Sequence, residues 1–200
     1  MSPAPCARRG AAALFAAALF AAPAPGASAA DLETIKKKAE LCVACHGVDG
    51  NSANPAIPTL AGQPKQFITT QLVMYREGNR KNPQMAPFTA NMSNADINDY
   101  GTYFAAQRRI SAGHSIPPEK VAAGRLLTEK YNCVQCHGPT LLGLQHIPGL
   151  AGQQPEYLKT QLEGFKASTR FDMDGNMTSA ARPLTPADID LISEYLASLQ

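Results

Sequence analysis

Two copies of the pattern C-x-x-C-H decide how this chain can fold: Leu41-Cys42-Val43-Ala44-Cys45-His46-Gly47 and Asn132-Cys133-Val134-Gln135-Cys136-His137-Gly138. The chain has 200 residues and five cysteines, and four of these cysteines lie in the two patterns. Two thiols at this spacing reach the two vinyl groups on one edge of a porphyrin, and the histidine that follows is carried under the iron. Each pattern therefore predicts one covalently attached haem c.

The residues that would hold the two haems follow directly. The predicted thioether residues are Cys42, Cys45, Cys133 and Cys136, and the predicted proximal iron ligands are His46 and His137. Three other interpretations account for less of the sequence. A redox dithiol would stand at a helix start beside a strand, and no strand pattern is evident. A zinc site could join the two cysteine pairs, but each pair has its own histidine and its own repeat. A disulfide framework leaves both histidines unexplained.

The rest of the chain repeats around these patterns. PTLAGQ at residues 58–63 returns as PGLAGQ at 148–153, and SNADI at 93–97 returns as TPADI at 185–189. This order predicts a tandem duplication, with domains at residues 30–108 and 118–200 and a polar linker at 109–117. Each half, at about 80 residues, is small for an independent core, and a haem would supply its apolar centre.

The periodicity of the apolar residues predicts an all-α fold. Helices are expected over residues 31–41 and 66–75, and again over 118–131 and 157–165. Ser93 and Thr185, each with an acidic residue three positions later, predict the N-caps of final helices that run to residues 105 and 199. No alternating strand pattern is present.

The sixth position of each iron is assigned by aligning the repeats. Met85 and Met177 each lie eight residues before the capping residue, in predicted loops, and follow their histidines by 39 and 40 residues. Methionine opposite histidine is the usual pair in electron-transfer cytochromes. The other methionines lack a counterpart, and Met74 and Met92 are interpreted as packing residues.

Two prolines follow the histidines at corresponding positions. A carbonyl at Pro58 or Pro148 could accept the N–H of the proximal imidazole, although a simple turn accounts for the pattern as well. His114 and His146 have no counterpart in the other repeat and are not predicted to bind iron.

The N-terminus has the pattern of an export signal. Arg8 and Arg9 precede an apolar run at residues 11–22, and Ala27-Ser28-Ala29 resembles a cleavage site. We predict a cleaved signal peptide at residues 1–29 and a soluble periplasmic protein, with an uncleaved anchor as the alternative. The run is too short to span a bilayer. Cleavage removes Arg8 and Arg9, so 18 basic and 16 acidic residues become 16 of each, a balance that argues against nucleic-acid binding.

In combination these motifs resemble the cytochrome c4 family, the dihaem members of the class I cytochromes c. The resemblance covers the mature chain and includes CHGVDGNS at residues 45–52, the doubled PxLAGQ blocks, EGNR at 77–80 and the two loop methionines. It implies two tandem class I cytochrome c domains related by a pseudo-twofold, with the haem propionate edges close together. It also implies a small residue where the first helix of each domain crosses the last. Gly124 fits this pattern, whereas Glu33 stands at the aligned place in the first domain.

The resemblance implies an electron carrier rather than an enzyme, passing electrons from the respiratory chain to a terminal oxidase. The alternative is a dihaem electron-accepting subunit of a periplasmic dehydrogenase, such as a flavocytochrome c sulfide dehydrogenase. A dihaem peroxidase would need an open iron site. The expected partners are redox proteins, namely a membrane respiratory complex, a terminal oxidase or a dehydrogenase, with a peripheral location at the membrane surface as one option. No nucleic acid and no small-molecule substrate are expected. The different residues near the two methionines predict two distinct potentials.

Overall fold

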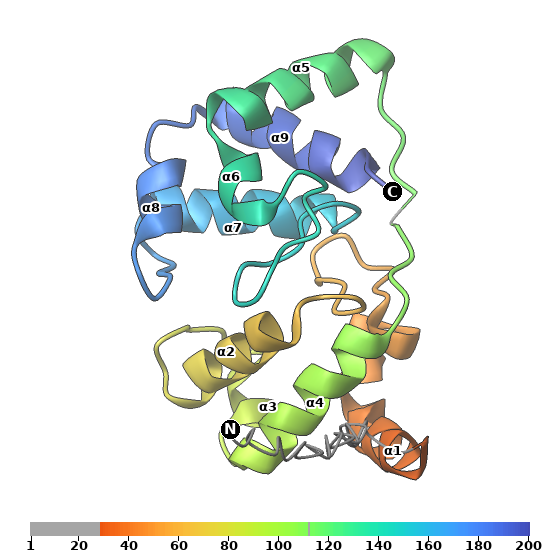
Figure 1. The fold of residues 1–200 in the computed structure, drawn as a ribbon. Coiled ribbons are helices and arrows are strands. Elements are labelled where there is room, and N and C mark those ends of the chain that lie inside the picture. The colour runs from red at the N-terminus through yellow and green to blue at the C-terminus, as the bar shows by residue number, and fades with distance from the viewer. Residues whose placement is uncertain (1–28, 112) are drawn as a thin grey trace, which may run out of the picture.

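The computed structural model of the protein describes residues 29–111 and 113–200. The predicted signal peptide, except for its last residue, lies outside the described residues. In the described ranges the backbone forms helices and one isolated bridge between Leu144 and Ile147, but no strand. The predicted all-α fold is therefore confirmed. Figure 1 shows two helical domains, one above the other, joined along one side by an irregular segment.

The two domains contain a similar sequence of elements, with two differences. The N-terminal domain consists of α1 (Ala29–His46), the 3-10 helix η1 (Val48–Gly50), α2 (Lys65–Arg76), α3 (Ala86–Thr89) and α4 (Asn94–Ala106). The C-terminal domain consists of α5 (Pro118–Lys130), α6 (Cys133–His137), α7 (Pro155–Lys166), α8 (Asn176–Ala181) and α9 (Pro186–Ser198).

One difference is η1, which has no helical counterpart in the described C-terminal domain. The other lies at the two C-x-x-C-H patterns. The first pattern is the end of α1, which continues beyond the predicted end at Leu41. The second pattern forms its own helix, α6, because Asn132 adopts a left-handed conformation (φ 56°) that ends α5. Asparagine tolerates this conformation because its short side chain can bond locally to the backbone. The corresponding residue in the first pattern is Leu41, which stays helical.

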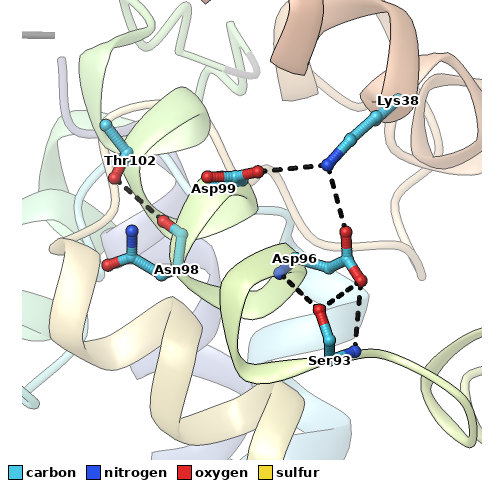
Figure 2. Close-up of polar contacts among 6 residues, drawn as sticks. All are labelled: Lys38, Ser93, Asp96, Asn98, Asp99 and Thr102. Carbon is cyan, nitrogen blue, oxygen red and sulfur yellow. Dashed lines mark hydrogen bonds and ion pairs between the residues drawn. The ribbon is translucent and has the colours of Figure 1, made fainter. Parts of the chain in front are cut away.

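The final helix of each domain begins with a capping box, as the sequence predicted. The Ser93 hydroxyl accepts a hydrogen bond from Asp96 N, and Ser93 N donates to the Asp96 carboxylate; Thr185 and Asp188 form the same pair in α9. In the N-terminal domain a side chain of α1 also bonds to this cap. Lys38 donates to Asp96 and Asp99 at 3.2 Å each, as Figure 2 shows. The hydrogen bonds from Ser93, followed by Lys38, hold the pKa of Asp96 below its usual range. These exposed pairs orient α1 more than they stabilise it.

The helix crossings differ between the two domains. Gly124 allows α5 to approach α9, since a Cβ atom at this position would overlap Tyr195 Cβ and lie 2.7 Å from Tyr195 Cγ. In the N-terminal domain Glu33 is exposed, and α1 instead packs through Ile35 and Ala39 on a cluster that contains Tyr103 and Phe104. The small residue expected in the second domain is thus confirmed, and the departure expected at Glu33 corresponds to a different contact.

Replacing Gly124 with leucine is expected to destabilise the C-terminal domain. A side chain here must displace Tyr195, and overpacking of this kind typically costs about 1–3 kcal/mol. The gain in helix propensity over glycine, roughly 1 kcal/mol, offsets only part of this cost. Denaturant unfolding followed by far-UV circular dichroism measures the effect. The matched control is Ala122→Leu, at an exposed position of the same helix. Equal stability of the two variants would contradict the tight crossing.

The two domains also differ in the size of their protein core. The buried cluster of the C-terminal domain has eleven residues and includes Ile189, Ile192 and Leu196. Among the side chains that the structure describes, the buried cluster of the N-terminal domain has five and includes Phe104. The stability of the N-terminal domain therefore depends more on the group bound at its centre. Within the described residues no helix combines the length and the apolar character needed to cross a bilayer.

Two candidate haem sites

One continuous cavity of about 2010 Å³ extends through both domains. Its walls include both C-x-x-C-H patterns, the two PxLAGQ segments and the segments that carry Met85 and Met177. The structure therefore brings the predicted site residues of each repeat to one space, and it brings the two sites next to each other. The cavity is lined largely by apolar side chains, as a haem requires.

The two histidines have matching environments. His46 and His137 are buried, and the Nδ1 atom of each lies 2.8 Å from a proline carbonyl, Pro58 O and Pro148 O respectively. A carbonyl oxygen can only accept, so Nδ1 carries the proton and the lone pair of Nε2 stays available to a metal. Burial lowers the pKa of both imidazoles despite the opposing effect of the carbonyl. Each ring thus has Nε2 free of a proton, which is the form that a metal ligand requires, and each proline segment holds the ring in place as well as forming a turn.

The four cysteines are free thiols that line the same cavity. Burial raises the pKa of the Cys42 thiol to about 11, and it also raises the pKa of the Cys133 thiol. A redox dithiol shows the opposite shift, because its attacking cysteine is activated by a lowered pKa. Cys42 and Cys133 are partly buried and Cys45 and Cys136 are exposed, and each pair precedes a buried histidine, an arrangement that suits thioether attachment.

Met85 and Met177 are each held by a side chain that accepts from the backbone. Met85 N donates to Asn82 Oδ1 at 3.0 Å, and Met177 N donates to Asp172 Oδ2 at 2.8 Å. The prediction that both methionines lie in loops is wrong for Met177, which lies within α8, whereas Met85 is the residue before α3. Asp172 accepts from Met177 N and Thr178 N in the first turn of α8, whereas Asn82 accepts from Gln84 N and Met85 N in the turn that precedes α3. Met74, Met92 and Met173 also line the cavity, so the matched anchoring distinguishes the predicted pair.

Two arginines in the cavity wall supply a test of whether a haem fits. Arg80 donates to Gln71 at 2.6 Å and to Gln161 at 2.8 Å, and Arg170 donates to the same Gln161 oxygen at 2.6 Å. Burial, followed by repulsion from Arg80, lowers the pKa of Arg170 to about 10. In the described part of the chain neither guanidinium forms an ion pair, and Arg170 Nε is buried without a hydrogen-bond partner. Two buried positive charges side by side need anions. The two propionates of a haem supply them, so the donor set fits.

The contact between the domains uses residues that were not predicted as functional. Gln63 and Gln153, both buried, each reach into the opposite domain and bond its backbone. Arg109 falls in the predicted linker, yet it donates to Ala61 O at 3.0 Å and to Ala151 O at 2.8 Å, which are equivalent atoms of the two repeats. The doubled PxLAGQ block was a visible signal for the glutamines. Nothing in the sequence distinguishes Arg109 from an ordinary linker residue.

Known proteins show the same architecture. The family model described as cytochrome c matches residues 33–105 and again residues 121–200. Cytochrome c4 of Pseudomonas aeruginosa is 35% identical, over 86% of this chain and 90% of the relative. A thiosulfate dehydrogenase electron acceptor of Thiomonas intermedia is 31% identical, over 91% of this chain and 86% of the relative. The crystal structure of reduced cytochrome c4 from Pseudomonas stutzeri superimposes with a TM-score of 0.78 and 31% identity, covering 84% of this chain and 98% of that one.

Proposed function

The chain belongs to the cytochrome c4 family of dihaem electron carriers, and on that basis we propose that His46 with Met85, and His137 with Met177, are the axial ligands of its two haems. The haems c are bound covalently, and Cys42 with Cys45, and Cys133 with Cys136, are the proposed thioether residues. The observation that carries the assignment is the matched pair of neutral imidazoles, each 2.8 Å from a proline carbonyl in one shared cavity.

The chain's own residues suit rapid one-electron transfer. The bound haems supply the iron that cycles between ferric and ferrous states. The proline carbonyls hold the imidazole planes, Asn82 and Asp172 fix the methionine backbones, and Arg80 and Arg170 provide positive charge at the domain contact. Rigid ligands change little between the two oxidation states, so reorganisation stays small. A site closed on both faces leaves no position for a substrate, as expected for a carrier.

The proposed physiological role is transfer of electrons in the periplasm from the membrane respiratory chain to a terminal oxidase. The cytochrome c4 relatives support this role, and the export pattern at residues 1–29 is the basis for the periplasmic location. Oxidase-containing membranes should oxidise the reduced protein at a rate that saturates with its concentration and stops with an oxidase inhibitor. Oxidation that continues unchanged in the presence of the inhibitor would reject the role.

A second candidate role is favoured by one comparison. The relative named as a thiosulfate dehydrogenase electron acceptor aligns over most of both chains, which supports a role for this chain as the dihaem acceptor of a periplasmic dehydrogenase. A purified thiosulfate dehydrogenase with thiosulfate should then reduce both haems, whereas a sulfide-oxidising flavoprotein tests the alternative derived from the sequence. Reduction by neither enzyme would leave the oxidase role as the only proposal.

The residues behind the two methionines predict different potentials. Asn82 and Asp172 each accept a hydrogen bond from a methionine N–H, but only Asp172 can carry a negative charge. Burial opposes the ionisation of Asp172, yet the Met177 N–H and other donors hold its pKa below the usual range. A nearby negative charge stabilises the ferric state. Asp172→Asn should therefore raise the potential of the C-terminal haem, and Asn82→Asp should lower that of the N-terminal haem. A spectroelectrochemical titration measures both, and a single shared potential in the unmodified protein would contradict the asymmetry.

A further inference from the structure

Each domain has one buried glutamine whose side chain bonds the backbone of the other domain. Gln63 Nε2 donates to Gly149 O and its Oε1 accepts from Gly149 N, both at 2.9 Å. Gln153 Nε2 donates to Thr59 O at 2.8 Å and its Oε1 accepts from Thr59 N at 2.7 Å. Thr59 and Gly149 are equivalent residues of the PxLAGQ segments. The two glutamines are each 2% exposed, so all four hydrogen bonds are shielded from water.

These contacts end on the peptide groups that support the histidines. Thr59 N belongs to the same peptide group as Pro58 O, and Gly149 N belongs to the same group as Pro148 O. One peptide group therefore accepts from the imidazole of its own domain and donates to the glutamine of the other domain. In the C-terminal site the order is His137 Nδ1–H, Pro148 O, Gly149 N–H and Gln63 Oε1. The order in the N-terminal site is His46, Pro58, Thr59 and Gln153.

Consecutive hydrogen bonds through one peptide group strengthen each other. Donation by the N–H increases the negative charge on the carbonyl oxygen, which becomes a better acceptor for the imidazole. A stronger bond to Nδ1–H makes the ring a more basic ligand. A more basic ligand favours ferric iron. The glutamine can thus affect a haem without touching it.

From this geometry we infer that Gln63 is a positioning residue for the C-terminal haem and Gln153 for the N-terminal haem, so that each domain sets part of the other domain's potential. The inference rests on the proposed ligation by His46 and His137. It goes beyond that proposal because the regulating residue and the regulated iron lie in different domains.

The interface keeps other bonds when a glutamine is removed. Arg109 connects Ala61 O and Ala151 O, and Gln154 Nε2 donates across the interface to Ser52 O at 2.6 Å. Gln154 is buried, like Gln63 and Gln153, but its bond ends on a carbonyl that supports no histidine. It is therefore a matched control for the loss of a buried cross-domain bond.

The experiment compares Gln63→Met, Gln153→Met and Gln154→Met in the full holoprotein. Carbon-13 labelled methionine methyl groups report the oxidation state of each haem separately by NMR during a redox titration. Gln63→Met should raise the C-terminal potential and leave the N-terminal one in place, with the reverse for Gln153→Met and neither shift for Gln154→Met. The expected change in the ferrous to ferric ratio at a fixed potential is roughly two- to tenfold. It is kept small because the glutamine acts through a peptide group, whereas a group bonded directly to a metal ligand typically changes metal affinity or activity by roughly 10–100-fold.

Three results would overturn the inference. They are a shift in the potential of the haem in the mutated domain itself, an equal shift in the potentials of both haems, and the same shift in the Gln154→Met variant. Amide exchange adds a separate readout, because Gln63→Met should speed exchange of the Gly149 N–H. The sulfur-to-iron charge-transfer absorption of the unmodified protein tests the proposed ligands independently. If this absorption is present and the crossed shift is missing, only the inference fails.

Discussion

Replacing Met177 with histidine is expected to lower the reduction potential of the C-terminal haem by on the order of a hundred millivolts or more, a part of the ~0.8 V that axial ligands span. The thioether of methionine favours ferrous iron, whereas imidazole favours ferric iron. The Met177 backbone is anchored by Asp172, so the new side chain starts from the same position in the cavity wall. The N-terminal haem should keep its potential.

The structure offers two matched variants for this experiment. Met85→His should lower only the N-terminal potential, because Met85 is anchored by Asn82 in the equivalent position. Met173→His should change neither, since Met173 is 78% exposed and has no counterpart in the other repeat. Loss of the sulfur-to-iron charge-transfer absorption from one haem identifies the ligand directly. An equally large effect of Met173→His would show that the wrong methionine has been assigned.

Replacing both Cys42 and Cys45 with serine is expected to remove the covalent haem of the N-terminal domain and to unfold that domain. Serine cannot form the thioethers, so haem content measured by pyridine haemochrome should fall by half and the mass by one haem. The described buried cluster that remains has five residues, and two of them, Ile68 and Phe104, line the cavity that the haem would fill. A core of this size does not offset the conformational entropy of a domain of about 80 residues.

Replacing both cysteines of the C-terminal domain with serine provides the matched comparison. Cys133→Ser with Cys136→Ser should also halve the haem content, but the C-terminal domain has a buried cluster of eleven residues and should retain more helix. Far-UV circular dichroism measures the helix that each variant loses. Equal losses in the two variants would show that the cores contribute equally without their haems.

Features encoded in a few adjacent residues were predictable. The C-x-x-C-H patterns and the capping residues Ser93 and Thr185 each depend on local chemistry that the sequence displays, whereas the small residue at Gly124 was expected from the family resemblance. Asn132 could have been recognised as a helix end by the same reasoning, because asparagine tolerates the left-handed conformation. The helix around Met177 was missed because its start depends on Asp172, five residues earlier, whose side chain satisfies the first N–H groups.

Features that depend on the opposite domain were not predictable. The sequence shows Gln63 and Gln153 in repeated blocks, but it does not show that their side chains bond another domain's backbone. Arg80 and Arg170 also repeat at a constant spacing, and that spacing could have drawn attention to them. Their partial burial without an ion pair in the described residues is explained by the anionic propionates that a haem would bring. Arg109 has neither a repeat nor a pattern.

Arg109 makes a contact that a fused chain can form and a symmetric pair of separate domains cannot. One guanidinium bonds the same carbonyl in both repeats, so it lies close to the pseudo-twofold axis. If two separate copies of an ancestral domain had met on this axis, each would have brought its own arginine to the same space, and the two charges would have repelled each other. A fused chain brings only one. The contact is therefore available to a fused chain that carries one arginine, and it is closed to a symmetric pair of separate domains that each carry it.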